Sequence, residues 1–395
     1  MRKLSIENFR RLIKEVTAEV IREGVGLPAH SVIPIEDFVT SELDEAGDML
    51  GAKHREFPPE EMQSYLGRVH DKEKTRTDIV NMPFVHGSNV EIKDEKGRKF
   101  NLEKLKKAIS QRPPVILKQN EKITKSGGGA TVYFNIGLPA IKGLAVNEKT
   151  GKFVIIDTCP GAGACKTFCY AKRGGYVQWK ASSMSQTRVL NFLLNDPDGF
   201  KTKLEDELLA AVNRYDKGDI DLVVRWHDSG DFFSPDYKNL AYSIARAFPK
   251  IRFYAYTKLA AIASGNKPKN FVTNFSTGAK PEQEKKVDVK KTKHSQVVPR
   301  QMFMDFIVTK DTQRGRLPEK DKAGKMQWKS PEELNKFKKK MSARYDIPVK
   351  SLITYGELME IPEGDEMKYN VIVKPGDGDD AAGRKDVLGT YLLIH

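Results

Sequence analysis

The three cysteines of the chain stand close together in one short segment. They are Cys159, Cys165 and Cys169, the only cysteines among 395 residues, and they are separated by five and by three residues. Packing gives no reason to confine every cysteine of so long a chain to one loop, so buried structural thiols are the weakest interpretation. Thiolates are soft ligands that bind zinc, copper(I) or iron–sulfur clusters. The segment therefore predicts a metal site.

The number of available ligands distinguishes between these metals. A structural zinc site needs a fourth ligand, but the cysteine segment contains no histidine, and the nearest along the chain is His227. A 4Fe–4S cluster held by three cysteines leaves one iron open to a small molecule. Gly161 and Gly163 permit the loop to wrap around such a cluster. We expect a 4Fe–4S cluster, with zinc and a metal-free loop as the alternatives.

Polar residues follow several predicted strands at the point where each strand ends. Strands are expected over 131–139, 152–158, 251–257 and 270–276, and 221–231 reads as a buried strand that ends in a polar turn. At the ends of four of them come Cys159, His227–Asp231, Lys258 and Ser276–Gly278. Strands that alternate with helices predict an α/β fold with a parallel sheet, as a partial or complete (β/α) barrel. Ligands bind at the carboxyl ends of the strands in such folds, so the pattern favours an enzyme.

Apolar periodicity and capping residues predict the helices between these strands. They are expected over 101–110, 177–194, 200–215, 235–247 and 330–344. The last begins with Ser330-Pro331-Glu332-Glu333, a capping box with proline at the first helical position. Two final strands are expected over 369–375 and 389–395, separated by a polar turn at Asp377–Asp380.

Two segments of the chain have weaker sequence patterns than the rest. Residues 1–100 read as an N-terminal extension with an amphipathic helix over 5–24, which either docks onto the body of the protein or, less favourably, lies on a membrane surface. Residues 101–395 form the α/β domain. Within it, 279–300 is rich in lysine and lacks an apolar period. We expect a surface insertion there, with a phosphate-binding arm as the sharper alternative.

Charge and hydropathy restrict the class of protein. The chain has 67 Lys and Arg against 53 Asp and Glu, a net charge of +14. This surplus favours a nucleotide or nucleic-acid partner, with a lysine-rich soluble surface as the alternative. No stretch approaches the ~18 apolar residues that span a bilayer, and the start lacks a signal-peptide pattern. We expect a cytoplasmic protein without membrane association, in which thiols stay reduced.

The cysteine segment resembles that of radical S-adenosylmethionine (SAM) enzymes. In that superfamily three cysteines after the first barrel strand hold a 4Fe–4S cluster, SAM binds the fourth iron, and reduction cleaves SAM to a 5′-deoxyadenosyl radical. An aromatic residue commonly precedes the last cysteine, as Phe168 does here. The spacing Cys-x5-Cys-x3-Cys departs from the usual Cys-x3-Cys-x2-Cys of the superfamily.

A closer resemblance is to the phage "gene product 88" family. It rests on the TCPGA segment at 158–162 with Cys165 and Cys169–Ala171, the SGD turn at 229–231, and the strand FYAYTK at 253–258. The likeness covers roughly residues 115–395. It implies a phage-encoded, radical SAM-like iron–sulfur protein that works in the cytoplasm of a bacterial host.

The radical SAM resemblance implies roles for the polar turn that ends the strand segment at 221–231. Ser229, Gly230 and Asp231 take the place of a Gly-Gly-Glu motif that binds the SAM amino group, because a carboxylate pairs with an ammonium. The remaining candidates for binding a substrate or moving a proton are His227, Asp228, Lys258, Arg188 and Asn191. A satisfied strand-end histidine and a solvated lysine are the structural alternatives for two of these.

Two functions from different classes follow. The first is a radical SAM-like enzyme with a 4Fe–4S cluster, SAM and an external electron donor, modifying a nucleotide or nucleic acid. The alternative is a non-catalytic phage accessory protein that binds nucleic acid and uses zinc or an iron–sulfur cluster structurally. An electron carrier is a weaker third, because carriers normally use four cysteines.

Overall fold

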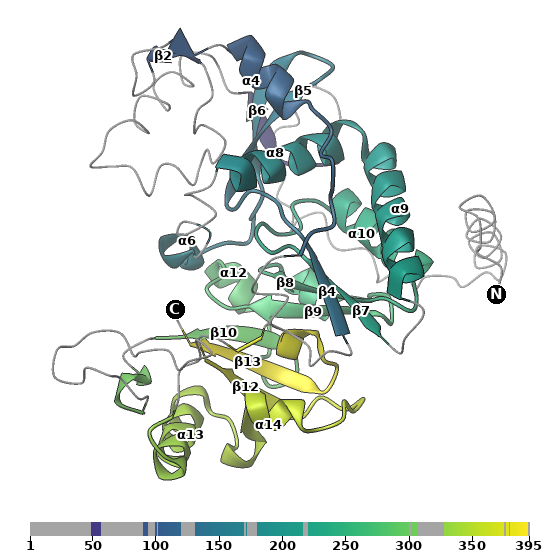
Figure 1. Ribbon diagram of the computed structural model, residues 1–395. Helices are drawn as coiled ribbons and strands as arrows, with labels where there is room; N and C mark the ends of the chain where they lie inside the picture. Colours follow the sequence, from purple (N-terminus) through teal and green to yellow (C-terminus); the bar gives the residue numbers. More distant parts are fainter. Residues whose placement is uncertain are drawn as a thin grey trace.

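The computed structural model describes residues 49–56, 90–93, 99–100, 102–119, 131–169, 171, 180–215, 220–299, 302–306, 328–374, 377–378 and 380–393 (Figure 1). The helix predicted over 5–24 lies outside these ranges. No helix of the described part is long and apolar enough to cross a membrane.

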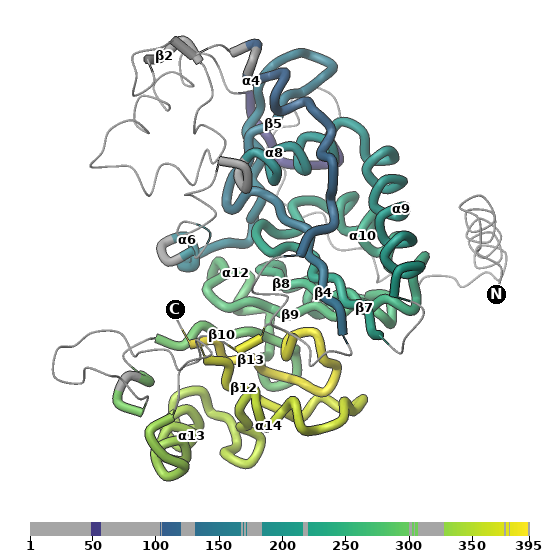
Figure 2. The backbone as a smooth tube through the Cα atoms, viewed as in Figure 1, coloured from purple at the N-terminus to yellow at the C-terminus, as the bar shows by residue number. Residues whose placement is uncertain are grey.

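Eight parallel strands form the main sheet. Each neighbouring pair is parallel. The strand order is β11 (Leu352–Thr354), β12 (Tyr369–Val373), β13 (Val387–Leu393), β10 (His294–Val298), β9 (Phe271–Ser276), β8 (Arg252–Thr257), β7 (Asp221–Trp226) and β4 (Thr131–Ile136). The backbone trace in Figure 2 shows this progression from β4 through β9 and β10 to β13 and β12. The two strands predicted at the end of the chain are confirmed as β12 and β13.

The sheet is open within the described residues. Its edges are β4 and β11, and no described strand joins them. The last strand along the chain, β13, is inserted beside β10 in the middle of the sheet, so it cannot close a ring against β4. The α/β class with a parallel sheet is therefore confirmed, whereas a complete barrel is not found in the part of the chain that the structure describes.

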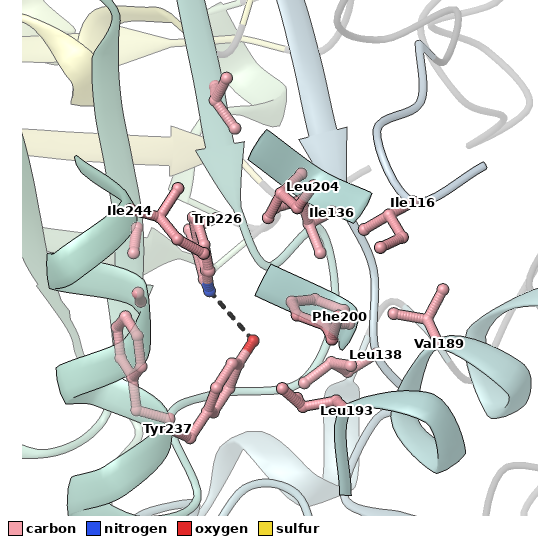
Figure 3. Packing of buried hydrophobic residues seen from close by; sticks show 14 of the residues in the cluster. Ile116, Ile136, Leu138, Val189, Leu193, Phe200, Leu204, Trp226, Tyr237 and Ile244 are labelled. Atoms are coloured by element: carbon pink, nitrogen blue, oxygen red, sulfur yellow. Dashed lines mark hydrogen bonds between the residues drawn. The ribbon is translucent and has the colours of Figure 1, made fainter. Parts of the chain in front are cut away.

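Three helices cover one face of the strands β4, β7, β8 and β9. They are α8 (Lys180–Asn195), α9 (Pro197–Tyr215) and α10 (Pro235–Ala247), and their apolar side chains share one buried cluster with those strands (Figure 3). Trp226 on β7 donates its indole N–H to the Tyr237 hydroxyl on α10 at 3.0 Å. The predicted limits of α10 are correct, because the Ser234 side chain accepts from the Tyr237 N–H and proline occupies the first turn.

A second, antiparallel sheet carries the cysteine segment. Its order is β1 (His54–Glu56), β6 (Lys152–Asp157) and β5 (Lys142–Asn147). The strand before Cys159 is β6, so the prediction that this strand belongs to the parallel sheet is wrong. The reason is a tight turn after β5, in which the Asn147 side chain accepts from the Lys149 N–H and Gly151 has a φ of +67°, so that β6 turns back along β5.

The lysine-rich segment contains part of the core. Its first half holds the short helix α12 (Pro281–Glu284), but its second half is β10, which lies between β9 and β13. The prediction of a surface insertion over 279–300 is therefore wrong for the residues from His294 onward. Lysines dominate the residues before the strand, and the five residues of β10 show little apolar alternation, so the sequence pattern does not predict a strand there.

Part of the predicted N-terminal extension also belongs to the body. Met49 and Ala52 are buried in the main core, and the Ser234 hydroxyl donates to the Leu50 carbonyl. The short strands β2 (Val90–Lys93) and β3 (Lys99–Phe100) pair with each other. The boundary at residue 100 is therefore too late for residues 49–56.

Two further predicted helices and six short elements complete the described structure. The predicted helices at 101–110 and 330–344 are confirmed as α4 (Leu102–Ile109) and α13 (Pro331–Tyr345). α13 is capped by Ser330, whose side chain accepts from the Glu333 N–H. The short elements are α6 (Cys165–Phe168), α11 (Ala260–Ser264), η5 (Met304–Phe306), η6 (Val349–Ser351), α14 (Tyr355–Met359) and η7 (Asp380–Gly383).

Candidate functional site

The cysteine loop leaves β6 and docks on the carboxyl edge of the parallel sheet. The Cys165 N–H donates to the Gly278 carbonyl at 3.0 Å, and the Lys280 N–H donates to the Gly161 carbonyl at 2.8 Å. Ala162 and Ala279 form an antiparallel bridge between the same two segments. Residues 278–280 follow β9, so the cysteine loop reaches the carboxyl edge of the parallel sheet. The strand that precedes the loop, β6, belongs to the antiparallel sheet.

Two glycines permit this close docking. A Cβ atom at Gly161 would lie 2.6 Å from the Lys258 carbonyl oxygen, and one at Gly163 would overlap the Ala279 carbonyl. Both obstacles are backbone atoms, which cannot move aside as a flexible side chain can. The sequence predicts these glycines as bends around a cluster, and the structure shows that they also let the loop contact the ends of β8 and β9.

Asp231 joins the turn after β7 to the cysteine loop and to β8. Its N–H donates to the Thr158 carbonyl at 2.8 Å, and its carboxylate accepts from the Lys258 N–H at 2.7 Å. The carboxylate also accepts hydrogen bonds from the Phe232 N–H and the Thr257 side chain. Burial raises the pKa of Asp231 to about 6, although these hydrogen bonds act in the opposite direction.

Ser229 and Gly230 connect the same turn to the loop that follows β4. The Ser229 hydroxyl donates to the Leu138 carbonyl and accepts from the Gln186 side chain at 2.9 Å. Gly230 has a φ of +85°, and a Cβ atom there would lie 2.9 Å from the Leu138 Cβ. A glycine is therefore required by the backbone conformation and by the packing of this turn.

Lys258 lies beside the cysteine loop but its amine is engaged. The ammonium group donates to the Ser276 carbonyl, the Ser276 hydroxyl and the Thr277 carbonyl at 2.7–3.0 Å. These three bonds use its three protons, so Lys258 ties the end of β8 to the end of β9. Its charge still acts on the loop, because it opposes the rise in the pKa of Cys165.

The cysteines are half-buried, and Cys169 interacts electrostatically with each of the other two. Burial raises the pKa of Cys159 well above its usual value, and the charges of Asp231, Cys169 and Asp157 act in the same direction. A hydrogen bond from the Ile141 N–H to the Cys159 Sγ, at 3.3 Å, opposes the rise. Burial and the charge of Cys169 also raise the pKa of Cys165. Cys169 therefore lies close enough to act on both other thiols, and metal binding would release protons from them.

The described residues contain no ready-made site for a single metal ion. Among the described residues, no three His, Cys, Asp or Glu side chains converge on one point where a metal ion could be bound. A tetrahedral zinc site requires such convergence. A 4Fe–4S cluster places each thiolate on a different iron, so its ligands stand farther apart. Cys169 acts electrostatically on both Cys159 and Cys165, and the Ile141 N–H donates to the Cys159 sulfur. These three thiols are the residues that could hold such a cluster.

Phe168 ends α6, directly before Cys169, and its side chain lies outside the described part of the chain. His227 is placed in the aromatic core. Its Nε2 lies 2.8 Å from the Tyr237 hydroxyl and its ring packs edge-on against Phe232. Burial, together with the charge of Arg225, lowers the pKa of His227 to about 3. His227 is therefore a neutral core residue.

Three further candidates make contacts away from the cysteine loop. The Asp228 carboxylate accepts from the Asn135 side chain at 2.8 Å at the end of β4. Arg188 donates to the Ala108 carbonyl at the end of α4, and Asn191 accepts from the Val146 N–H on β5. Arg188 and Asn191 thus attach α8 to its neighbours, and the structure does not bring them to the loop.

Two residues of the site are not among the functional residues predicted from the sequence, although Thr158 opens the TCPGA segment. Ile141 follows β4 and has a φ of +67°, a conformation that a β-branched residue rarely adopts. Thr158 donates its hydroxyl to the Pro139 carbonyl and so fixes the start of the cysteine loop. The packing of the 137–141 segment against the loop reveals their roles.

Much of the chain matches a known protein family, and part of it matches two curated phage proteins. The family described as gene product 88 matches residues 114–342, more than half of the 395 residues. "Gene 88 protein" of Mycobacterium phage D29 is 33% identical over 147 residues, which is 36% of this chain and 54% of that protein. "Gene 88 protein" of Mycobacterium phage L5 is 32% identical over 147 residues, with the same coverage.

The chain thus spans about half the length of the curated relatives it matches. No solved structure matches it. The matched region contains the cysteine loop, the SGD turn and the strand that ends at Lys258. The chain belongs to the phage gene product 88 family.

Proposed function

We propose that the protein binds a 4Fe–4S cluster through Cys159, Cys165 and Cys169 and acts as a radical SAM-like enzyme. The observation that carries the proposal is the docking of the only cysteine-bearing loop on the carboxyl edge of a parallel sheet. That edge is where α/β enzymes bind their ligands. The loop is held there by backbone bonds to Gly278 and Lys280 and by the Asp231 N–H.

The residues around the loop serve to position it. When bound, the cluster would supply one-electron reducing power and an iron without a protein ligand. Asp231 fixes the loop to β7 and β8, while Lys258 fixes β8 to β9 and places one positive charge beside Cys165. This charge offsets part of the negative charge that thiolates and Asp231 would concentrate there.

SAM is the proposed ligand of the open iron because of the likeness of the cysteine segment to radical SAM enzymes. The structure gives no support for a direct bond from the Asp231 carboxylate to the SAM amino group, since that carboxylate already accepts from two backbone N–H groups and a hydroxyl. A positioning role fits Asp231 better. The net charge of +14 supports a nucleotide or nucleic acid as the substrate.

The proposal is tested by anaerobic reconstitution. The protein is supplied with iron and sulfide, reduced with dithionite and incubated with SAM. A brown protein with absorbance near 400 nm that releases 5′-deoxyadenosine supports both parts. A brown protein that never forms 5′-deoxyadenosine refutes the SAM reaction and leaves cluster binding intact. One zinc per chain without that absorbance refutes both and favours a structural metal site.

A further inference from the structure

Ile141 has an unusual backbone for its residue type. It is one of four non-glycine residues of the described chain with a positive φ, at +67°. A β-branched side chain makes the left-handed conformation energetically unfavourable, and such residues persist only where their surroundings impose them. The surroundings are visible here, because the Thr158 N–H donates to the Ile141 carbonyl at 3.1 Å and the Lys142 N–H donates to the Ala140 carbonyl at 2.7 Å.

This conformation directs the Ile141 amide at the first cysteine. Its N–H donates to the Cys159 Sγ at 3.3 Å, while its carbonyl accepts from the residue before that cysteine. One residue therefore holds the backbone and the sulfur of the loop entrance together. A hydrogen bond to a ligand sulfur is one of the means by which proteins adjust an iron–sulfur cluster.

The Ile141 side chain belongs to a small apolar cluster against which Cys169 packs. It is 6% exposed and packs with Ala140 and Ala171, and Cys169 packs against the same group. A glycine would adopt the backbone conformation without strain, but it would remove the largest side chain of the cluster against which Cys169 packs. Isoleucine at this position can act in two ways at once, through its amide on Cys159 and through its side chain on the cluster beside Cys169.

We propose that Ile141 is a positioning residue for the metal centre: its amide donates to the sulfur of the ligand Cys159 and its side chain supports the arm that carries Cys169. The inference rests on the proposed cluster. It adds that the segment after β4, which bears no metal ligand, contributes a hydrogen bond to the cluster's environment. The segment also packs against the SGD turn, since the Leu138 N–H donates to the Ser229 carbonyl at 3.1 Å.

The experiment detects the Ile141 nitrogen directly. Protein is produced with ¹⁵N-isoleucine as the only labelled residue, the cluster is reconstituted and reduced, and electron spin-echo modulation is recorded. We expect a weakly coupled ¹⁵N nucleus in the unsubstituted chain. In Ile141→Val, which keeps the amide, the β-branch and the fold, this ¹⁵N signal is lost because the donor nitrogen is no longer labelled. In Ile353→Val, on β11 far across the sheet, the signal remains.

Each result decides the inference. A cluster that forms without any coupled ¹⁵N, or whose ¹⁵N coupling survives in Ile141→Val, overturns it while the proposed cluster stands. A protein that takes up no iron and sulfide overturns the proposed function itself, which is a separate outcome visible before any modulation is recorded.

Discussion

The Asp231 carboxylate accepts a hydrogen bond from the Lys258 N–H at 2.7 Å, while the Asp231 N–H donates to Thr158 at 2.8 Å. One residue thus links the ends of two parallel strands to the loop that carries the cysteines. The link explains how a loop from a separate antiparallel sheet comes to lie at the carboxyl edge of the main sheet. It also places a buried carboxyl group within electrostatic reach of Cys159.

Replacing Asp231 should change the pH dependence of stability. Its pKa is raised from 3.8 to about 6 by burial, so the folded protein binds a proton more tightly than the unfolded chain. The stabilisation from this proton is complete below about pH 4 and is lost as the pH rises through 6, a change of about 3 kcal/mol. Asp231→Asn should remove this component.

The measurement is chemical denaturation of each variant between pH 4 and pH 8. The difference in unfolding free energy between the original chain and Asp231→Asn should shift across this range by a few kcal/mol. The matched control is Asp236→Asn, which makes the same substitution at an exposed site. A constant difference at every pH contradicts the assignment of Asp231 as a buried carboxyl group.

His227 should make the protein sensitive to acid in the opposite sense. Its folded pKa is lowered from 6.5 to about 3 because the ring is buried beside Arg225. Below pH 6.5 the unfolded chain binds a proton that the folded protein excludes, so stability falls by about 1.4 kcal/mol per pH unit toward pH 3. His227→Gln should flatten this decline. Unchanged iron content in His227→Gln would agree with a core role, and loss of the metal would argue for a place in the site.

The docking of the loop should depend on Gly163. Alanine there places its Cβ against the Ala279 carbonyl, so Gly163→Ala should destabilise the protein by roughly 1–3 kcal/mol and lower its metal content. Gly356 lies in α14 with only the Thr354 hydroxyl near its Cβ position, at 4.0 Å. Gly356→Ala should therefore be neutral or stabilise by up to about 1 kcal/mol. Equal thermal melting of the two variants would show that the loop does not need this contact.

The sequence carries the local features of this fold well. Ser234 and Pro235 mark the start of α10, and the apolar strands β7, β8 and β9 are read close to their true limits. Helix caps and buried strands depend on residues that are close together along the chain, so their patterns are visible in the sequence. The approach of the three strand ends to one edge follows from their parallel order.

The long-range features could not be read in this way. β6 is as apolar as a strand of the main sheet, and only its pairing with β5 and β1 shows where it belongs. β10 follows a lysine-rich stretch that is not typical of a core strand, and its place in the middle of the main sheet could not be predicted. The contacts of Ile141 with Cys159 and of Gly161 with Lys258 join different segments of the chain. Neither an isoleucine nor a glycine predicts such a contact by its residue type.

The central claim concerns the metal and is tested most directly by counting it. Iron, acid-labile sulfide and zinc are measured per chain after anaerobic reconstitution, for the original protein and for Cys159→Ser, Cys165→Ser and Cys169→Ser, with Lys166→Ala as a control inside the same loop. We predict about four irons and four sulfides per chain, retained in Lys166→Ala and lost in each cysteine variant. Iron that persists in any of the three cysteine variants, or zinc in place of iron in the original protein, would contradict a 4Fe–4S cluster at this loop.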